Sequence, residues 1–117
     1  MKRKDEITAL AREIESCRKT LTALGDETRQ HLILQMMLAG DDCSGMRVPD
    51  ITERTSLSRP AVSHHLQILK DAGIVSVRKE GTMNYYYFSS DNTISELIKM
   101  LEHADRIINT LPDRRGD

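Results

Sequence analysis

The sequence predicts a mainly α-helical fold that contains a small β-hairpin, and three observations lead to it. Residues 49–73 have the pattern of a short helix, a tight "SLS" turn and a second helix that begins after Ser58. Residues 74–88, "IVSVRKEGTMNYYYF", follow directly and place β-branched and aromatic residues on both sides of an "EGT" turn. Both ends of the chain carry apolar residues at alternating steps of three and four. The expected order is helix, helix, helix, helix, strand, strand, helix, which is a winged helix-turn-helix.

The first and last helices are expected over about residues 5–24 and 92–111, and each carries a heptad seam. In a small domain such seams leave apolar surface, which a second copy of the chain buries most economically. We therefore expect a homodimer that forms through these two helices. The expected interface residues are Ile7, Leu10, Ile14, Cys17 and Leu21 in the first helix and Ile94, Leu97, Leu101, Ala104, Ile108 and Leu111 in the last.

The second helix is delimited by local signals. Gly25 ends the helix before it, and Asp26 caps its start with Glu27 in the first turn. It is expected to stop near Gly40. The side chains that it is expected to bury are Leu32, Ile33, Met36 and Met37.

The helix-turn-helix is expected over about residues 49–73 and the wing over about 74–89. Pro49 occupies the first turn of the third helix, where its missing N–H costs nothing. Ser58 caps the fourth helix, and Pro60 again lies in the first turn. The fourth helix is expected to bury Val62, Leu66 and Leu69 and to stop at Gly73.

The bulk composition fits one soluble globular domain, residues 1–117, with 38% hydrophobic and 30% charged residues. The net charge of −1 gives no global attraction to nucleic acid or to a membrane. No apolar run is long enough to span a bilayer, and the opening "MKRKDEITAL" lacks the apolar stretch of a signal peptide. The two cysteines, Cys17 and Cys43, form no CxxC pair, so a reducing cytoplasm is expected.

His64 and His65 are neighbours in the fourth helix, and this spacing argues against a shared metal ion. Successive helical residues point about 100° apart, whereas a helical zinc pair uses a spacing of four. His64 lies beside the polar stripe of Arg59, Ser63 and Gln67, whereas His65 lies inward among apolar neighbours. We therefore expect His64 at a DNA groove and His65 in a structural, half-buried position. The alternative for the stripe is a solvated polar face.

The fourth helix and its flanks carry a more specific pattern, S-x-x-x-V-S-x-H-L-x-x-L-x-x-A-G-I-V, and "ALGDETRQHLILQMM" precedes it. With the hairpin, these stretches resemble the arsenical-resistance repressors of bacteria, the ArsR/SmtB type, over about residues 20–110. The resemblance implies a homodimeric winged-helix repressor. Its fourth helix would enter the major groove, and its hairpin would reach the flanking minor groove or backbone. Two such helices about 34 Å apart would read an inverted repeat in double-stranded DNA.

The predicted DNA-binding surface joins the fourth helix to the wing. Arg suits guanine, Gln suits adenine, and Ser or His serves bases or phosphates. From Arg47 to Asn84 six basic residues stand against four acidic ones, a net charge of +2 that is modest for a DNA-binding segment. Thr82 stands where the resembled family usually has an arginine, which predicts weaker phosphate anchoring by the wing. The predicted DNA-binding residues are Arg54, Ser58, Arg59, Pro60, Ala61, Ser63, His64, Gln67, Arg78, Lys79, Thr82 and Asn84.

No metal site and no cofactor is predicted. The resembled family commonly uses either of two metal sites, and neither is complete in this sequence. The stretch "MRVPDI" at the third helix has no cysteine. In the last helix Arg106 stands three residues after His103, and Thr93 stands where a histidine would follow Asp91. One histidine beside a cation is not a metal site.

The two cysteines leave one sensing hypothesis open. Cys17 lies on the first seam, where a free cysteine is usually a small buried hydrophobe. Cys43 lies in an expected loop whose carboxylates disfavour its thiolate. In a dimer the two thiols could approach across subunits, either as a redox pair or with His31 as a soft-metal site. The sequence does not identify an inducer.

The leading hypothesis is a sequence-specific, dimeric transcriptional regulator that acts as a repressor. The alternative is a winged-helix protein–protein interaction module, for which Arg59 and Gln67 would be dispensable and affinity would barely depend on salt. An enzyme is not expected, because the sequence shows no nucleophile–base set, no glycine-rich phosphate loop and no carboxylate pair in an evident cleft.

Overall fold

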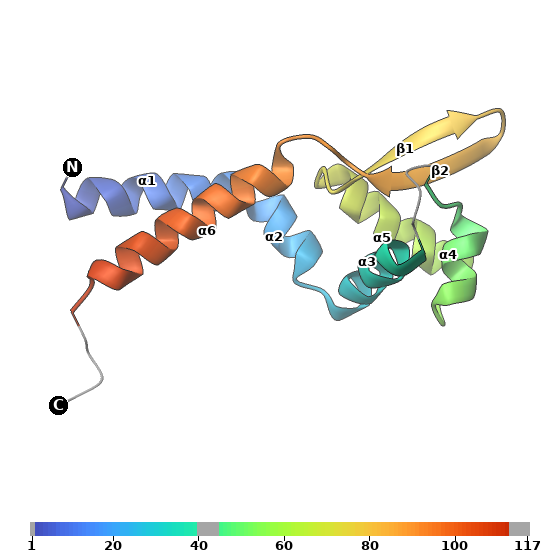
Figure 1. Cartoon of the computed structure of the whole chain (residues 1–117), viewed down its shortest axis with the longest axis horizontal. Coiled ribbons are helices and arrows are strands. Elements are labelled where there is room, and N and C mark those ends of the chain that lie inside the picture. Colours follow the sequence, from blue (N-terminus) through green and yellow to red (C-terminus); the bar gives the residue numbers. More distant parts are fainter. Residues whose placement is uncertain (1, 40–44, 113–117) are drawn as a thin grey trace.

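The computed structural model describes residues 2–39 and 45–112 of the chain. The molecule measures 58 × 30 × 25 Å because two long helices, one from each end of the chain, extend together away from the remainder (Figure 1). Its elements are α1 (Arg3–Ser16), α2 (Arg18–Leu24), α3 (Glu27–Ala39), α4 (Val48–Arg54), α5 (Arg59–Asp71), β1 (Val75–Glu80), β2 (Met83–Phe88) and α6 (Thr93–Thr110). We name α1 with α6 the stalk, and α2–α5 with the hairpin the body. The predicted winged helix-turn-helix is confirmed.

The first helix is divided in two, which corrects the prediction of one continuous helix over residues 5–24. Cys17, with φ −95° and ψ 6°, ends α1 and begins α2. α1 packs on α6, whereas α2 contacts α3 and α5, so the break brings the fully buried Ala23 into the body. Neither glycine nor proline stands at the break. Tertiary packing therefore overrides a local preference for a continuous helix.

The core of the body is built around α5. Val62, Leu66 and Leu69 are each 0% exposed, as the periodicity predicted. Burying a side chain of this size contributes roughly 1.5–3 kcal/mol to stability. The buried cluster consists of Ala23, Leu32, Met36, Ile51, Val62, Leu66, Leu69, Ala72, Ile74 and Val75.

α3 begins as predicted, because the Oδ1 atom of Asp26 accepts a hydrogen bond of 3.0 Å from the backbone N–H of Arg29. Leu32 and Met36 are buried, but Met37 is 60% exposed, so its predicted burial was wrong. Met37 lies about 100° around the helix from Met36 and therefore points away from the core. The predicted helix stop near Gly40, and the other loop residues up to 44, lie outside the described residues.

The wing is a two-stranded antiparallel hairpin. β1 pairs with β2 in a register that sets Val77 opposite Tyr86, and Gly81 turns the chain with a φ of 62°. A backbone bridge adds Met46 to this sheet. The N–H groups of Met46 and Tyr86 each donate a 2.8 Å bond to the other residue's carbonyl. The segment that enters α4 is therefore joined directly to the wing.

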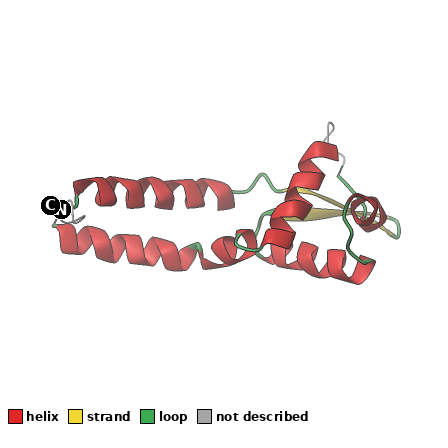
Figure 2. Ribbon diagram, turned by 90° about the horizontal axis from the view of Figure 1, so that it is seen from below, coloured by secondary structure: helices red, strands yellow, loops and turns green. Residues whose placement is uncertain are grey.

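The stalk consists of α1 and α6, which run antiparallel along each other (Figure 2). At its far end the Arg3 guanidinium donates to the Oγ1 and carbonyl O atoms of Thr110, at 3.3 and 3.2 Å. Nearer the body the Nδ1 atom of His103 lies 2.9 Å from the Oε2 atom of Glu13. The stalk is thus held by polar contacts along its length as well as by apolar packing.

Each heptad seam divides between two surfaces. In α1 and α2, Leu10, Cys17 and Leu24 pack into a small second core with Leu97 and Met100. The seam residues that alternate with these buried ones point outward, and each is at least 37% exposed. These outward residues are Ile7 (48%), Ile14 (44%) and Leu21 (37%), followed in and after α6 by Ile94 (42%), Leu101 (52%), Ile108 (63%) and Leu111 (45%). Ala104 is half-buried.

Gly73→Ala should destabilise the protein more than the control Gly81→Ala. Both glycines have positive φ, 80° and 62°, so alanine is strained at either position by about 1–2 kcal/mol. At Gly73 the added Cβ would also lie 2.5 Å from the Oγ1 atom of Thr93, whereas at Gly81 no atom lies within 4 Å. Urea denaturation should show a loss of about 2–4 kcal/mol for Gly73→Ala. Equal losses in the two variants would mean that Thr93 moves aside without cost.

Candidate nucleic-acid interface

The helix-turn-helix is fixed by hydrogen bonds at its turn. The Thr55 hydroxyl, which is buried, donates to the carbonyl of Ile51 at 3.1 Å and closes α4. The Ser58 Oγ atom then accepts from the backbone N–H of Ala61 at 3.3 Å and caps α5, as predicted. Pro60 occupies the first turn, where no N–H is needed. α5 therefore begins at a defined residue with a defined orientation.

α5 separates its residues into an apolar inner stripe and a polar outer one. The inner stripe is the fully buried set of Val62, Leu66 and Leu69. Of the residues predicted to contact DNA, Ala61 is half-buried. The others in this helix and its cap are exposed, namely Ser58, Arg59, Pro60, Ser63, His64 and Gln67. An exposed, hydrogen-bonding N-terminal half is the arrangement by which a recognition helix meets base edges in the major groove.

Gln67 has a partner that the sequence analysis did not identify. Its Nε2 atom donates to the Oδ1 atom of Asp71 at 2.9 Å, one helical turn further on. The spacing of four is a known favourable one for Gln and Asp, so it was a usable signal. The contact orients the amide and leaves its Oε1 acceptor and second N–H available to a base.

The wing residues make contacts both along one strand and across the hairpin. The Nε atom of Arg78 donates to Glu80 at 3.0 Å, and its guanidinium lies 5.0 Å from the centre of the Tyr85 ring. Lys79 stands opposite Asn84 in the sheet, and both side chains are exposed. Thr82 is exposed in the turn. In the wing, Arg78 is therefore held by contacts with Glu80 and Tyr85, whereas the Lys79 side chain is exposed at the surface.

The cations of the surface differ in their availability. Within residues 2–39 and 45–112, Arg54, Arg59 and Lys79 take part in no ion pair, and all three are exposed. Arg78, in contrast, is paired with Glu80. Exposed unpaired cations are the groups that displace counterions from phosphates at least cost.

The two histidines have separate environments, as predicted from their positions on the helix. His64 is exposed, and its ring lies 5.7 Å from that of His65. His65 is half-buried, and its Nδ1 atom lies 3.4 Å from a guanidinium nitrogen of Arg29. Burial lowers the pKa of His65 below its ordinary 6.5, and the Arg29 charge adds to this while Asp26 opposes it.

The structure adds two observations on the residues considered for metal binding or sensing. In the described ranges, 2–39 and 45–112, no three His, Cys, Asp or Glu side chains gather as a metal site would require. Cys17 is 5% exposed in the stalk core, and buried thiols of this kind are inert. His31 is exposed on α3. Cys43 lies outside the described residues, so the thiol hypothesis stays a prediction.

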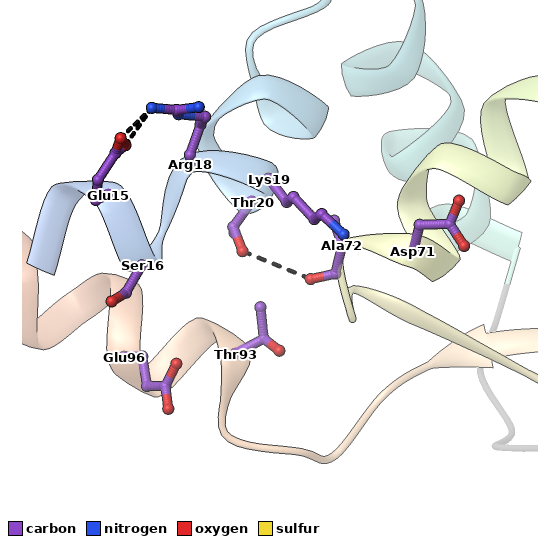
Figure 3. A pocket seen from close by; sticks show the side chains of 9 residues that line it. All are labelled: Glu15, Ser16, Arg18, Lys19, Thr20, Asp71, Ala72, Thr93 and Glu96. Atoms are coloured by element: carbon purple, nitrogen blue, oxygen red, sulfur yellow. Dashed lines mark hydrogen bonds and ion pairs between the residues drawn. The ribbon is translucent and has the colours of Figure 1, made fainter.

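A groove of about 510 Å³ lies where the stalk meets the body, at the C-terminal end of α5 (Figure 3). The hydroxyl of Thr20 donates across it to the carbonyl of Ala72 at 3.5 Å, and Arg18 pairs with Glu15 at its rim. Its lining is mostly charged or hydroxyl-bearing, unlike the apolar lining of most small-molecule sites. The groove lies at the opposite end of α5 from its N-terminus, which is about one helix length, roughly 20 Å, away.

Comparisons with known proteins agree with this geometry. Residues 26–77 match the family described as bacterial regulatory protein, arsR family. The chain is 39% identical over 88 residues to an uncharacterized HTH-type transcriptional regulator of Methanocaldococcus jannaschii, covering 75% of this chain and 93% of that one. It is 33% identical over 86 residues to the transcriptional repressor SdpR of Bacillus subtilis, covering 71% and 90%. The crystal structure of an ArsR family transcriptional regulator shares the fold, with a TM-score of 0.68 at 16% identity, over 84% and 95% of the two chains.

A capped helix with an exposed polar face, followed by a β-hairpin, defines a winged helix-turn-helix protein, and the matched family and relatives make it a DNA-binding transcriptional regulator. The chain belongs to the ArsR family of these regulators. Its relatives are transcriptional regulators rather than enzymes, which agrees with the expectation from the sequence. In the described part of the chain, no helix has both the length and the apolar character needed to cross a membrane.

Ser58→Ala should destabilise the protein through loss of the α5 cap. The Ser58 Oγ atom satisfies a backbone N–H at the helix start, and removing such a cap costs about 0.5–2 kcal/mol. Ser63→Ala is the matched control, because Ser63 is exposed in the helix interior and alanine is a better helix former. Thermal and urea denaturation of both variants measure the difference. A loss of stability as large for Ser63→Ala as for Ser58→Ala would contradict the cap.

Proposed function

We propose that the protein is a homodimeric repressor that binds an inverted-repeat operator in the cytoplasm, with α5 of each protomer in the major groove. The observation that carries the proposal is the division of α5, because its inner stripe is fully buried and its polar N-terminal half is exposed. Helices of this kind read base edges through their first turns. Kinship with a transcriptional repressor, SdpR, supports repression rather than activation.

In this proposal the contacts with DNA divide into two kinds. Arg59, Ser63, His64 and Gln67 lie on the face that would read bases, and Gln67 can pair with an adenine through the amide groups that Asp71 leaves available. The remaining exposed residues would hold phosphates and fix the register. Arg54 and Lys79 are suited to this role, since both are exposed and unpaired among the described residues.

Dimer formation in this proposal uses the outward half of each heptad seam. Seven apolar side chains of the two heptad seams are at least 37% exposed in a single protomer. Water-exposed apolar residues in a continuous helical pattern mark an interaction surface, and a two-fold mate presents the matching pattern. Cys17 and Leu97 are buried within the protomer and so contribute to the dimer mainly by supporting the exposed residues.

The alternatives differ in what supports them. A protein–protein module is the second class, and the ArsR kinship favours DNA over it. A thiol sensor needs Cys17 to react, and its burial argues against that. The inducer stays unassigned.

Gln67→Ala should cost about 1–3 kcal/mol of binding free energy at one base pair of the operator. Fluorescence anisotropy with duplexes changed one pair at a time measures this, starting from a duplex that the wild-type protein selects from a randomised library. Lys79→Ala is the matched control, because loss of a phosphate contact weakens binding to all sequences alike and lowers the salt dependence by about one unit of slope. Affinity that hardly changes with salt in the wild type would instead favour the protein–protein module.

Leu101→Glu should convert the dimer into a folded monomer. The side chain is 52% exposed in the protomer, so a glutamate there leaves the core of the protomer intact. In the proposed dimer it would bury an unpaired charge in the interface. Leu38→Glu on α3 is the control, since Leu38 is 69% exposed and lies outside the stalk. Light scattering after gel filtration measures the mass, and circular dichroism checks the helices. Dissociation by Leu38→Glu but not by Leu101→Glu would move the interface to α3.

A further inference from the structure

Arg29 is a buried cation that connects three helices. It lies in the first turn of α3, is 8% exposed, and its guanidinium contacts partners in three directions. Its Nε atom donates to the carbonyl of Ala23 at 2.8 Å, and its Nη2 atom donates to the carbonyl of Thr22 at 3.1 Å, both at the end of α2. Its Nη1 atom lies 3.4 Å from the Nδ1 atom of His65 on α5. A buried charge of this kind needs all of its partners.

This geometry selects one protonation state of His65. A guanidinium only donates hydrogen bonds and stays charged, so the facing Nδ1 atom has to accept. The ring is therefore neutral and carries its proton on Nε2. Protonation would replace an acceptor with a second donor and set two positive charges against each other at 3.4 Å.

The charged and titratable groups that act on His65 come from two elements. Asp26 and Arg29 act from the start of α3, and His64 acts from α5 itself. The Asp26 carboxylate contacts Arg29 twice, through the backbone N–H at 3.0 Å and the Nη1 atom at 3.9 Å. Its attraction for a proton on His65 exceeds the repulsion from Arg29. Burial is the largest cause that lowers the pKa of His65, and Arg29 and His64 lower it further.

We propose that the Arg29–His65 contact positions the recognition helix, and that protonation of His65 releases it and weakens DNA binding. The inference rests on the proposed DNA-binding function. His65 directly follows the exposed His64 in α5. A displacement of α5 at this point therefore also moves Ser63 and Gln67, which are proposed to read bases. Arg29 and His65 are positioning residues in this scheme and touch no DNA.

The sign of the pH effect follows from the lowered pKa. With the folded-state pKa below the ordinary 6.5, the neutral form and its contact are fully present above pH 6.5. Both are lost as the pH falls through the folded-state pKa. Any positive charge that the DNA-facing surface gained in acid would act in the opposite direction, because a cation near phosphates strengthens binding. A loss of affinity in acid is therefore the distinguishing result.

The test compares wild type with His65→Asn by fluorescence anisotropy on the selected duplex, between about pH 5.5 and 7.5. The Oδ1 atom of asparagine can accept from Arg29 but does not titrate. We expect wild-type affinity to fall by up to about tenfold for each pH unit below the His65 pKa, and His65→Asn to lose this part of the pH dependence. His31→Asn is the matched control, since His31 is exposed on α3 and outside the predicted interface, and it should keep the wild-type profile.

A second measurement needs neither DNA nor a variant. Long-range proton–nitrogen NMR of the wild-type protein should show His65 as the Nε2–H tautomer, with a titration midpoint below the ordinary 6.5 of histidine. An Nδ1–H tautomer, or a His65 midpoint at or above 6.5, would overturn the inference even if His65→Asn failed to fold. Identical pH profiles for wild type and His65→Asn would overturn it as well. Wild-type protein that binds no duplex at neutral pH would instead refute the proposed function, while the NMR result still decides the state of His65.

Discussion

The burial of one face of α5 is the constraint on which the rest of the molecule depends. Val62, Leu66 and Leu69 are wholly inside, so the helix has a single rotational setting relative to its neighbours. That setting turns Ser63 and Gln67 outward, and the hydrogen bond from Gln67 to Asp71 then orients the exposed amide. The same core continues into Ile74 and Val75, and so determines where the wing leaves the body. The proposed DNA-binding surface is therefore positioned by the packing of the opposite face of α5.

Much of this could be predicted because the signals are local. Ser58 as a cap, glycine at position 73 where φ is 80°, and the apolar period of α5 act within a few residues of one another. The break at Cys17 could not be predicted, because no residue there disfavours a helix and only contacts with distant elements separate α1 from α2. The exposure of Met37 was missed for a related reason. Its apolar character indicates burial, but the rotation of α3 about its axis is set by packing against the other elements.

The candidate site shows the same division between local and tertiary information. The exposure of Ser63, His64 and Gln67 follows from helical spacing alone. The contact between Arg29 and His65 joins residues 36 positions apart and exists only in the folded chain. A partial signal was present, because Arg29 stands three residues before the buried Leu32 on the inward stripe of its helix. A cation on such a stripe needs buried partners, although its sequence position does not say which residues they are.

The division of the heptad seams has a consequence for how such a protein can evolve. Positions 10, 17 and 97 serve the fold of the protomer, whereas positions 7, 14, 101 and 108 lie on its surface. Residues of the second group can change in size or charge without opening a cavity in the first. In the proposed dimer, two duplicated copies of this gene could therefore diverge in which partner they accept while each kept its own stability. Within one seven-residue repeat, the buried positions stabilise the fold of the protomer, and the exposed positions would determine its partner in the proposed dimer.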